Sequence, residues 1–175
     1  MSADVKKIRI GIDPGKKGFV TAIINSKEYL FSPIPLIGKE VDIHELDKII
    51  KDFMLCDDIH CVIEDLHSIF GASSKSTFSF GFICGATEAV LIANKMSFTK
   101  IKPKEWQKQM WQGIPVQKKP SSTGKTMVND TKLMSLMAAK RLFPNIDLRA
   151  TNRSKNPHDG KVDSLLLASY CEKNY

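Results

Sequence analysis

The chain has 175 residues, of which 42% are hydrophobic and 26% charged, and its net charge is +7. This length fits one domain, residues 1–175, with a proper core rather than two domains. No apolar run approaches the ~20 residues that span a bilayer, and the first residues lack the apolar segment of a secretory signal. We therefore expect a folded protein without a membrane partner that stays where it is made, in the cytoplasm or nucleoid.

The cysteines give no sign of a disulfide framework or a zinc site. They form no C-x-x-C pair and no cluster with histidine at zinc-ligand spacing. Reduced, mostly buried thiols are the expected state. The four are Cys56, Cys61, Cys84 and Cys171.

Positive charge is concentrated in one part of the chain. Residues 95–141 contain eleven Lys and Arg against Glu105 and Asp130 alone, so this stretch carries +9 and the remainder is slightly acidic. Segregated basic charge favours a polyanionic partner, because each neutralised phosphate releases bound counterions. A basic surface that merely aids solubility is an equal alternative. Charge alone does not separate DNA from RNA or from an acidic membrane.

The first predicted elements are three strands. Residues 8–13 alternate apolar side chains and indicate a buried strand. A Pro-Gly turn at 14–18 leads to a second strand at 19–24, and a turn at 25–27 leads to a third at 28–31. Together they predict an antiparallel meander.

A loop with two prolines follows at residues 33–41. Asp42 then caps a predicted helix that runs to about residue 55 with one apolar face. Residues 61–64 are apolar and β-branched, which predicts a central strand, and residues 78–94 predict a second helix.

The rest of the chain alternates between strand, helix and loop. It comprises a strand at 98–101, a short helix from Pro103, a basic loop at 113–128, a helix at 130–143 and a final helix at 160–170. Three strands followed by alternating helix and strand predict an α/β fold with a central mixed five-stranded sheet flanked by helices. This order matches the RNase H-like arrangement.

Acidic residues end two of the predicted strands. Asp13 follows an apolar strand, and Glu64 closes the strand at 61–64. A buried carboxylate is costly unless a partner or a metal ion neutralises it, and hard divalent cations prefer oxygen ligands. Turn initiation before Pro-Gly is the alternative for Asp13; turn chemistry explains Glu64 less well.

A second pair of acids lies at the start of the last predicted helix. Asp159 and Asp163 are four residues apart and share one helix face. The apolar residues of 166–170 continue this face and should pack on the sheet, so both carboxylates turn toward Asp13 and Glu64. A helix N-cap is the alternative for Asp159, whereas Asp163 lies on the apolar stripe.

Three motifs in order resemble the RuvC family of Holliday junction resolvases. They are IGIDPG-x-x-G at 10–18, VIE at 62–64 and HDG-x-x-DSLL at 158–166. The phage and plastid branches are the most similar, because their final helix opens with His-Asp-Gly, a second acid and leucines. The resemblance covers most of the chain; Asp-Pro-Gly alone is weak, but three motifs in this order are specific.

The resemblance implies a homodimeric endodeoxyribonuclease that resolves four-way DNA junctions by paired symmetric nicks. It implies two Mg²⁺ or Mn²⁺ ions in each active site, held by Asp13, Glu64, Asp163 and, with a spacing that departs from bacterial RuvC, Asp159. One ion would activate a water molecule and the other would stabilise the leaving oxygen. His158 is an outer ligand, a junction contact or a plain capping residue.

Further residues are candidates for DNA contacts. Phe70 follows the strand that ends at Glu64 and either stacks on bases at the junction or caps the sheet. Lys75, among glycines and serines, offers a donor to phosphate or belongs to an ordinary mobile loop. The basic loop adds three candidates for contacts with the phosphate backbone: Lys118, Lys119 and Lys125.

Two further features of the sequence allow both a structural and a functional interpretation. Trp106 is expected in the core, although a tryptophan can also stack on nucleic acid. Gly81 and Gly85 permit a close helix contact, either in a dimer or within the chain.

Several other functions compete. Gly124-Lys125-Thr126 is similar to the end of a P-loop, but that pattern needs glycine where the chain has Lys119, so no nucleotide cofactor is expected. Sugar kinases and actin-like ATPases need two such domains, for which the chain is too short. Another RNase H-like nuclease, acting on RNA or on branched or flap DNA, remains an alternative. So does a non-catalytic junction-binding protein, although it would not explain acids beside a basic segment.

Overall fold

Five strands form one mixed sheet in the computed structural model of the chain, which describes residues 6–54, 58–65 and 73–175. They are β1 (Lys7–Ile12), β2 (Phe19–Ile24), β3 (Glu28–Pro33), β6 (Asp58–Glu64) and β7 (Phe98–Ile101). The order across the sheet is β3-β2-β1-β6-β7. β1 is antiparallel to β2 and parallel to β6, and β7 is parallel to β6. The predicted mixed five-stranded sheet is confirmed.

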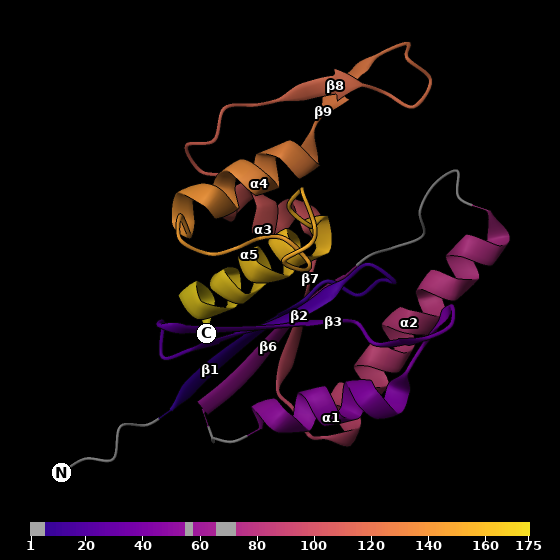
Figure 1. Cartoon of the computed structure of the whole chain (residues 1–175), viewed down its shortest axis with the longest axis vertical. Helices are drawn as coiled ribbons and strands as arrows, with labels where there is room; N and C mark the ends of the chain where they lie inside the picture. The colour runs from indigo at the N-terminus through magenta and orange to yellow at the C-terminus, as the bar shows by residue number, and fades with distance from the viewer. Residues whose placement is uncertain (1–5, 55–57, 66–72) are drawn as a thin grey trace.

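Helices cover both faces of this sheet (Figure 1). They are α1 (Ile43–Phe53), α2 (Ser74–Ala93), α3 (Pro103–Met110), α4 (Thr131–Leu142) and α5 (Asp159–Asn174). The isoleucines of β1 pack with α1 and α2 in one hydrophobic cluster. Val62 of β6 packs with α3, α4 and α5 in another cluster, on the opposite face. Alternation along the strands thus builds two cores, one on each side.

The central strand β1 lies directly against α5. A Cβ atom at Gly11 would lie 2.1 Å from the backbone nitrogen of Ala168 and 2.3 Å from the carbonyl oxygen of Ser164. The hydroxyls of Ser164 and Thr21 are hydrogen-bonded at 2.7 Å, which ties α5 to β2 as well. Glycine in β1 therefore allows the helix to approach the sheet at backbone distance.

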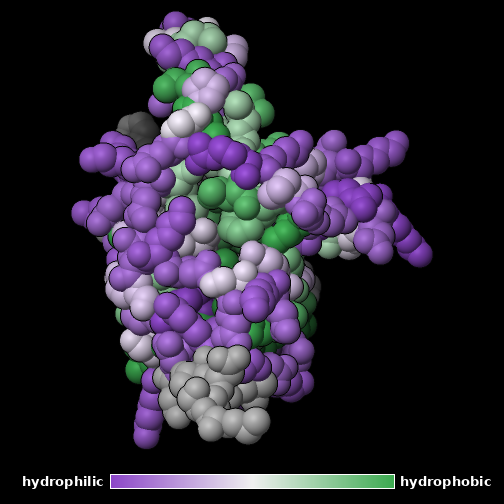
Figure 2. Space-filling view, turned by 90° about the vertical axis from the view of Figure 1, so that its left-hand side faces the viewer, coloured by the Kyte–Doolittle hydropathy of each residue, from purple (hydrophilic) through white to green (hydrophobic). Residues whose placement is uncertain are grey.

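Two segments predicted as loops contain short hairpins. Within 33–41, β4 (Leu36–Ile37) pairs with β5 (Glu40–Val41), and within 113–128, β8 (Lys118–Pro120) pairs with β9 (Met127–Asn129). The β8–β9 hairpin projects from the body at the top of Figure 1. Figure 2 shows mostly hydrophilic residues on the face seen from the side, with hydrophobic residues gathered below the projecting hairpin.

Helix α2 begins four residues earlier than predicted, at Ser74 rather than residue 78. Its N-cap is Ser73, whose hydroxyl accepts a hydrogen bond from the backbone N–H of Ser76 at 3.2 Å, so this serine-rich stretch is helical and not a loop. With 20 residues, α2 is long and apolar enough to cross a membrane by length and composition alone, which corrects the expectation that no such run exists. Core helices of soluble proteins pass the same test. Only 28% of the apolar stretch is buried, so much of it faces outward.

Other boundaries shift by a few residues. β6 begins at Asp58 rather than residue 61, and α5 begins at Asp159 and extends to Asn174. Asp42 caps α1 as predicted, and its carboxylate accepts a hydrogen bond from the backbone N–H of Glu45. Trp106 is fully buried, which confirms its place in the core.

Candidate active site

Parallel pairing places two acids at the same edge of the sheet. The register between β1 and β6 ends with Ile12 opposite Ile63, and the next residues along the chain are Asp13 and Glu64. The carboxyl ends of neighbouring parallel strands meet at one edge, so both side chains emerge there.

The N-terminus of α5 reaches the same edge. Gly160 lies against the turn between β1 and β2, where a Cβ atom would be 2.1 Å from the carbonyl oxygen of Lys17 and 3.0 Å from Oδ2 of Asp13. A larger residue would therefore push the helix away. Asp159 and Asp163 flank this glycine on α5 and are carried to the site by the close contact.

A cavity of about 400 Å³ lies where these elements meet. Three of the four predicted acids line it, and the charge of the fourth, Glu64, acts on Asp13 across the site. The turn after β1, the N-terminus of α4 and the start of α5 contribute the polar part of the lining. The lining residues are Asp13, Pro14, Gly15, Lys17, Gly18, Phe80, Lys132, Pro157, His158, Asp159, Gly160 and Asp163.

Burial and mutual repulsion disfavour the charged form of these carboxyls. Burial raises the pKa of Asp13 well above its usual value, and the charges of Asp163, Glu64 and Asp159 raise it further. Burial raises the pKa of Glu64 to about 7 and that of Asp163 to about 6. Like charges gathered in a partly dry site need a cation to remain ionised together.

Three uncharged or cationic partners hold the acids in place. The indole Nε1 of Trp106 donates a hydrogen bond to Oε1 of Glu64 at 2.8 Å. A hydrogen bond with Ser135 lowers the pKa of Asp163, opposing the effect of burial. The amino group of Lys132, at the start of α4, contacts Oδ2 of Asp159 at 2.5 Å.

Sequence reasoning missed Lys132 and the hydrogen bond from Trp106. Lys132 lies 27 residues before Asp159 and belongs to no motif, although its place at the start of a predicted helix was visible. The ion pair raises the pKa of Lys132, so the amino group is firmly cationic at neutral pH. Lys132 therefore places a positive charge in direct contact with Asp159, one of the four acids.

The donor set suits a hard divalent cation, since every candidate ligand is a carboxylate. Among the residues that the structure describes, no group of three or more His, Cys, Asp or Glu side chains is arranged to hold a metal ion. The four acids interact electrostatically without meeting at one point. Coordination would require side-chain movement, and Asp159 would exchange its contact with Lys132 for the ion.

The other predicted residues have different positions. His158 lines the cavity as the N-cap residue of α5, which corrects the alternative that Asp159 is the cap, and its side chain makes no capping hydrogen bond. Its Nδ1 is buried without a partner among the described residues, and its ring lies 5.0 Å from that of Phe19.

Lys75 is exposed in the first turn of α2. Phe70 lies outside the described residues.

The structure places the three lysines of the basic segment on the β8–β9 hairpin, not in the cavity lining. Lys118 and Lys125 are exposed. Lys119 is ion-paired with Asp130, the N-cap of α4, at 3.0 Å. Two of the three are thus available to a partner, while the third anchors the hairpin to α4.

In sequence, the chain matches no protein-family model and no curated protein. In structure, it is similar to Thermus thermophilus RuvC in complex with a Holliday junction substrate, with a TM-score of 0.55 and 12% identity over 94% of this chain and 92% of that one. A second structure of Thermus thermophilus RuvC gives a TM-score of 0.54 and 15% identity, over 95% of this chain and 96% of that one.

The yeast mitochondrial Holliday junction resolvase Ydc2 is also similar, with a TM-score of 0.52 and 14% identity over 97% of this chain and 79% of that one. The predicted fold class is therefore confirmed: the chain has the RNase H-like fold of RuvC type. Identities this low concern the fold and leave the chemistry to be argued from the site itself.

Proposed function

We propose that this chain is a metal-dependent endonuclease that resolves four-way DNA junctions by paired symmetric nicks, of the phage or plastid type in view of its His-Asp-Gly motif. The observation that carries the proposal is the convergence of Asp13, Glu64, Asp159 and Asp163 on one edge of the sheet, with the pKa of Asp13, Glu64 and Asp163 raised. Acids that repel each other beside a basic segment suit a site that gathers metal ions and phosphate together.

The four carboxylates would hold Mg²⁺ or Mn²⁺, two ions in each site. Bound ions of this kind activate water and stabilise the leaving oxygen of a phosphodiester. Trp106 orients Glu64 by its hydrogen bond, and Ser135 does the same for Asp163. Lys132 neutralises Asp159 before the ions bind and lies where it can then meet a backbone phosphate.

The projecting hairpin supplies the second part of the proposal. Lys118 and Lys125 are exposed on it, and the ion pair of Lys119 with Asp130 fixes its base to the helix that also carries Lys132. A two-stranded ribbon fits the major groove of a duplex. We infer that the hairpin contacts one arm of the junction, and that His158 and Phe70 are further junction contacts.

A homodimer would place two such sites on one junction. The outward face of α2 carries exposed apolar residues and glycines after its polar first turn: Phe78, Gly81, Phe82, Gly85, Ala89 and Ile92 are exposed. A Cβ atom at Gly81 or Gly85 would meet nothing within 4 Å, so each glycine leaves a notch in the surface that is open to another molecule. Bulky rings beside glycine notches form a self-complementary surface, as a two-fold contact requires.

The test uses end-labelled four-way junctions, linear duplex, flap DNA and RNA, each with Mg²⁺ or with EDTA. Wild-type protein should nick the junction symmetrically with Mg²⁺ and should leave it uncut with EDTA. Asp13→Asn should abolish detectable cutting, because it removes a charged ligand of the ions that activate water and stabilise the leaving oxygen, while retaining junction binding. Asp52→Asn, which removes an exposed carboxylate on α1, is the matched control and should cut normally.

Other outcomes would assign a different function. Metal-dependent cutting of RNA or flap DNA without cutting of the junction would identify another RNase H-like nuclease with the same acids. Tight junction binding without any cutting under Mg²⁺ or Mn²⁺ would indicate a non-catalytic junction-binding protein.

A further inference from the structure

A second cavity, of about 630 Å³, lies beside the candidate active site along α2. Consecutive residues line the two cavities: Lys16 and Ser79 face the second one, whereas Lys17 and Phe80 face the first. We propose that the second cavity is a phosphate-binding subsite that holds the DNA backbone within a few nucleotides of the phosphate to be cut. This inference rests on the proposed function and adds a defined backbone contact to it.

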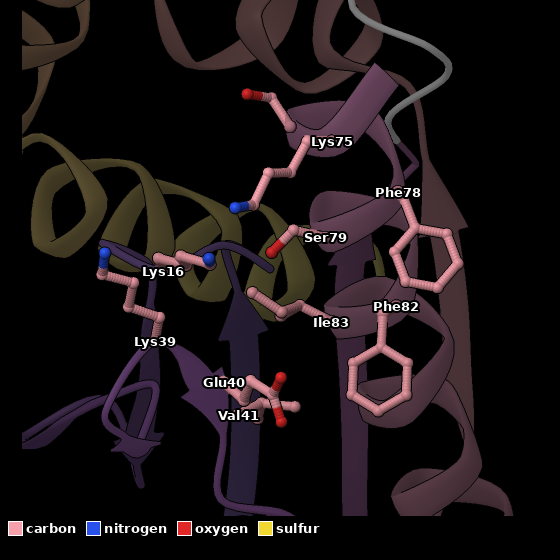
Figure 3. A pocket seen from close by; sticks show the side chains of 10 residues that line it. Lys16, Lys39, Glu40, Val41, Lys75, Phe78, Ser79, Phe82 and Ile83 are labelled. Atoms are coloured by element: carbon pink, nitrogen blue, oxygen red, sulfur yellow. The ribbon is translucent and has the colours of Figure 1, made fainter. Parts of the chain in front are cut away.

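Three lysines from three separate elements line this cavity. Lys16 comes from the turn after β1, Lys39 from the turn between β4 and β5, and Lys75 from the first turn of α2. In Figure 3 the amino groups of Lys16 and Lys75 and the hydroxyl of Ser79 point toward the same space. Elements distant in sequence thus bring cationic groups to one hollow.

These amino groups are not neutralised by the protein. None of the three lysines forms an ion pair or a side-chain hydrogen bond within the part of the chain that the structure describes. Glu40 is the one acid among the lining residues, and its carboxylate forms no ion pair with them. Figure 3 shows it beside Val41, away from the amino groups of Lys16 and Lys75.

The position of Lys75 also indicates an anion. A lysine in the first turn of a helix is unfavourable, because the helix N-terminus already carries partial positive charge. An anionic group bound in the cavity would be attracted both by the lysines and by the helix N-terminus. The same arrangement that is repulsive in the free protein becomes favourable when a phosphate is present.

Its neighbourhood identifies the phosphate as part of a nucleic-acid strand. Lys16 is three residues from Asp13, so their Cα atoms are at most ~11 Å apart. A phosphate close to the cut can therefore lie in reach of its side chain. Phe78 and Phe82 line the cavity from α2 and belong to the proposed dimer face, so the subsite lies at the border of that contact.

The experiment compares two triple variants that remove the same charge. One is Lys16→Gln with Lys39→Gln and Lys75→Gln. The control is Lys27→Gln with Lys140→Gln and Lys173→Gln, three exposed lysines without an ion pair among the described residues; they lie in the turn between β2 and β3 and near the C-terminal ends of α4 and α5. Both are made in the Asp13→Asn background, so that bound junctions stay intact, and affinity is measured from 50 to 200 mM salt.

The subsite variant should bind the junction at least ten-fold more weakly than the control at 150 mM salt. Its salt dependence, the slope of log affinity against log salt concentration, should fall by about 0.9 for each duplex phosphate contact that is lost, and so by up to ~2.7 for three lysines. Junctions with neutral methylphosphonates near the cut should locate the contact. When the methylphosphonate replaces a contacted phosphate, the protein with the three lysines and the subsite variant should bind the junction with equal affinity.

Equal affinities and slopes for the two triple variants would overturn the subsite and leave the proposed function intact, provided that wild-type protein still cuts the junction. Absence of junction binding by the wild-type protein would overturn both. Weaker binding that no methylphosphonate position reproduces would show a general charge effect and would also reject the subsite.

Discussion

Glu64 is the carboxylate whose charge state is most finely balanced in the site. Its pKa of about 7 results mainly from burial, opposed by the hydrogen bond from Trp106. Because the pKa is raised in the folded protein, folding favours the protonated form. The resulting stabilisation of the fold is complete below pH 4.5, the ordinary pKa of a glutamate, and disappears as pH rises through about 7.

Glu64→Gln should therefore stabilise the metal-free protein at pH 8 by roughly 1 to 3 kcal/mol and leave its stability at pH 4.5 little changed. Glutamine keeps an oxygen that accepts the hydrogen bond from Trp106. Urea unfolding at both pH values in EDTA measures the effect, with Asp52→Asn as the control. An equal effect at the two pH values would show that ionisation of Glu64 does not limit stability.

Trp106→Phe should shift the pH dependence of cutting. The variant loses the only described hydrogen-bond donor to Glu64, so the pKa of Glu64 should rise and the acidic limb of the pH–rate profile should move to higher pH. Trp111→Phe is the control, because the Nε1 of Trp111 has no partner among the described residues and its ring contacts Trp106 edge-on. Similar shifts in both variants would assign the effect to packing.

Among the elements, α5 depends most on a single residue of another element. Gly11→Ala would place a methyl group about 2 Å from the backbone of α5, which the sheet and helix can relieve only by separating. We expect destabilisation of roughly 3 kcal/mol or more and loss of cutting at temperatures where the variant is still folded, because Asp163 moves with the helix. Gly81→Ala, where the added methyl meets open space within the chain, should instead leave the stability of the monomer unchanged or raise it by ~0.5 to 1 kcal/mol.

Chemical denaturation of the two glycine variants and a cutting assay on Gly11→Ala provide the measurement. Normal activity of a destabilised Gly11→Ala protein would contradict the idea that the contact positions Asp163.

The elements that bury a regular stripe could be predicted from the sequence. Ile8, Ile10 and Ile12 alternate because one side of β1 faces the core, and this period is visible without a structure. The hairpins could not be predicted in this way. Their strands have two or three residues, too few for a period, and Pro120 argues against a strand. The start of α2 was missed because capping serines resemble a loop.

At the scale of the whole molecule, the exposed apolar face of α2 is the surface on which the proposed dimer depends. Gly85→Glu should leave the monomer folded, since its Cβ meets nothing within 4 Å, but should place a charge inside the proposed dimer contact. We expect a monomer by analytical ultracentrifugation and a loss of paired cutting in favour of single, uncoupled nicks. Leu30→Glu, an exposed apolar position on β3, is the control and should remain dimeric. A dimeric Gly85→Glu protein would place the interface elsewhere.

The whole-molecule arrangement also explains which part of the site was predictable. Asp13 and Glu64 each end a predicted strand, and Asp159 and Asp163 share a predicted helix face, so the sequence pattern was enough to select them as candidates for one site. That the two strands are neighbours is a property of the fold. Lys132 reaches Asp159 only because α4 packs beside α5, a tertiary contact that no local pattern encodes. The ion pair of Lys119 with Asp130, which anchors the hairpin to α4, has the same origin.

The contact between β1 and α5 has a consequence for the chain as it is made. Asp13 is translated 150 positions before Asp163, and at 5–20 residues per second roughly 8 to 30 s separate them on the ribosome. Until the end of that interval the nascent chain lacks residues 157–163, which complete the lining of the cavity. Under the proposed function, a newly emerging or prematurely terminated polypeptide without these residues should not cut the nucleic acid around it. Its uncovered isoleucine strand is at the same time the surface that chaperones would recognise.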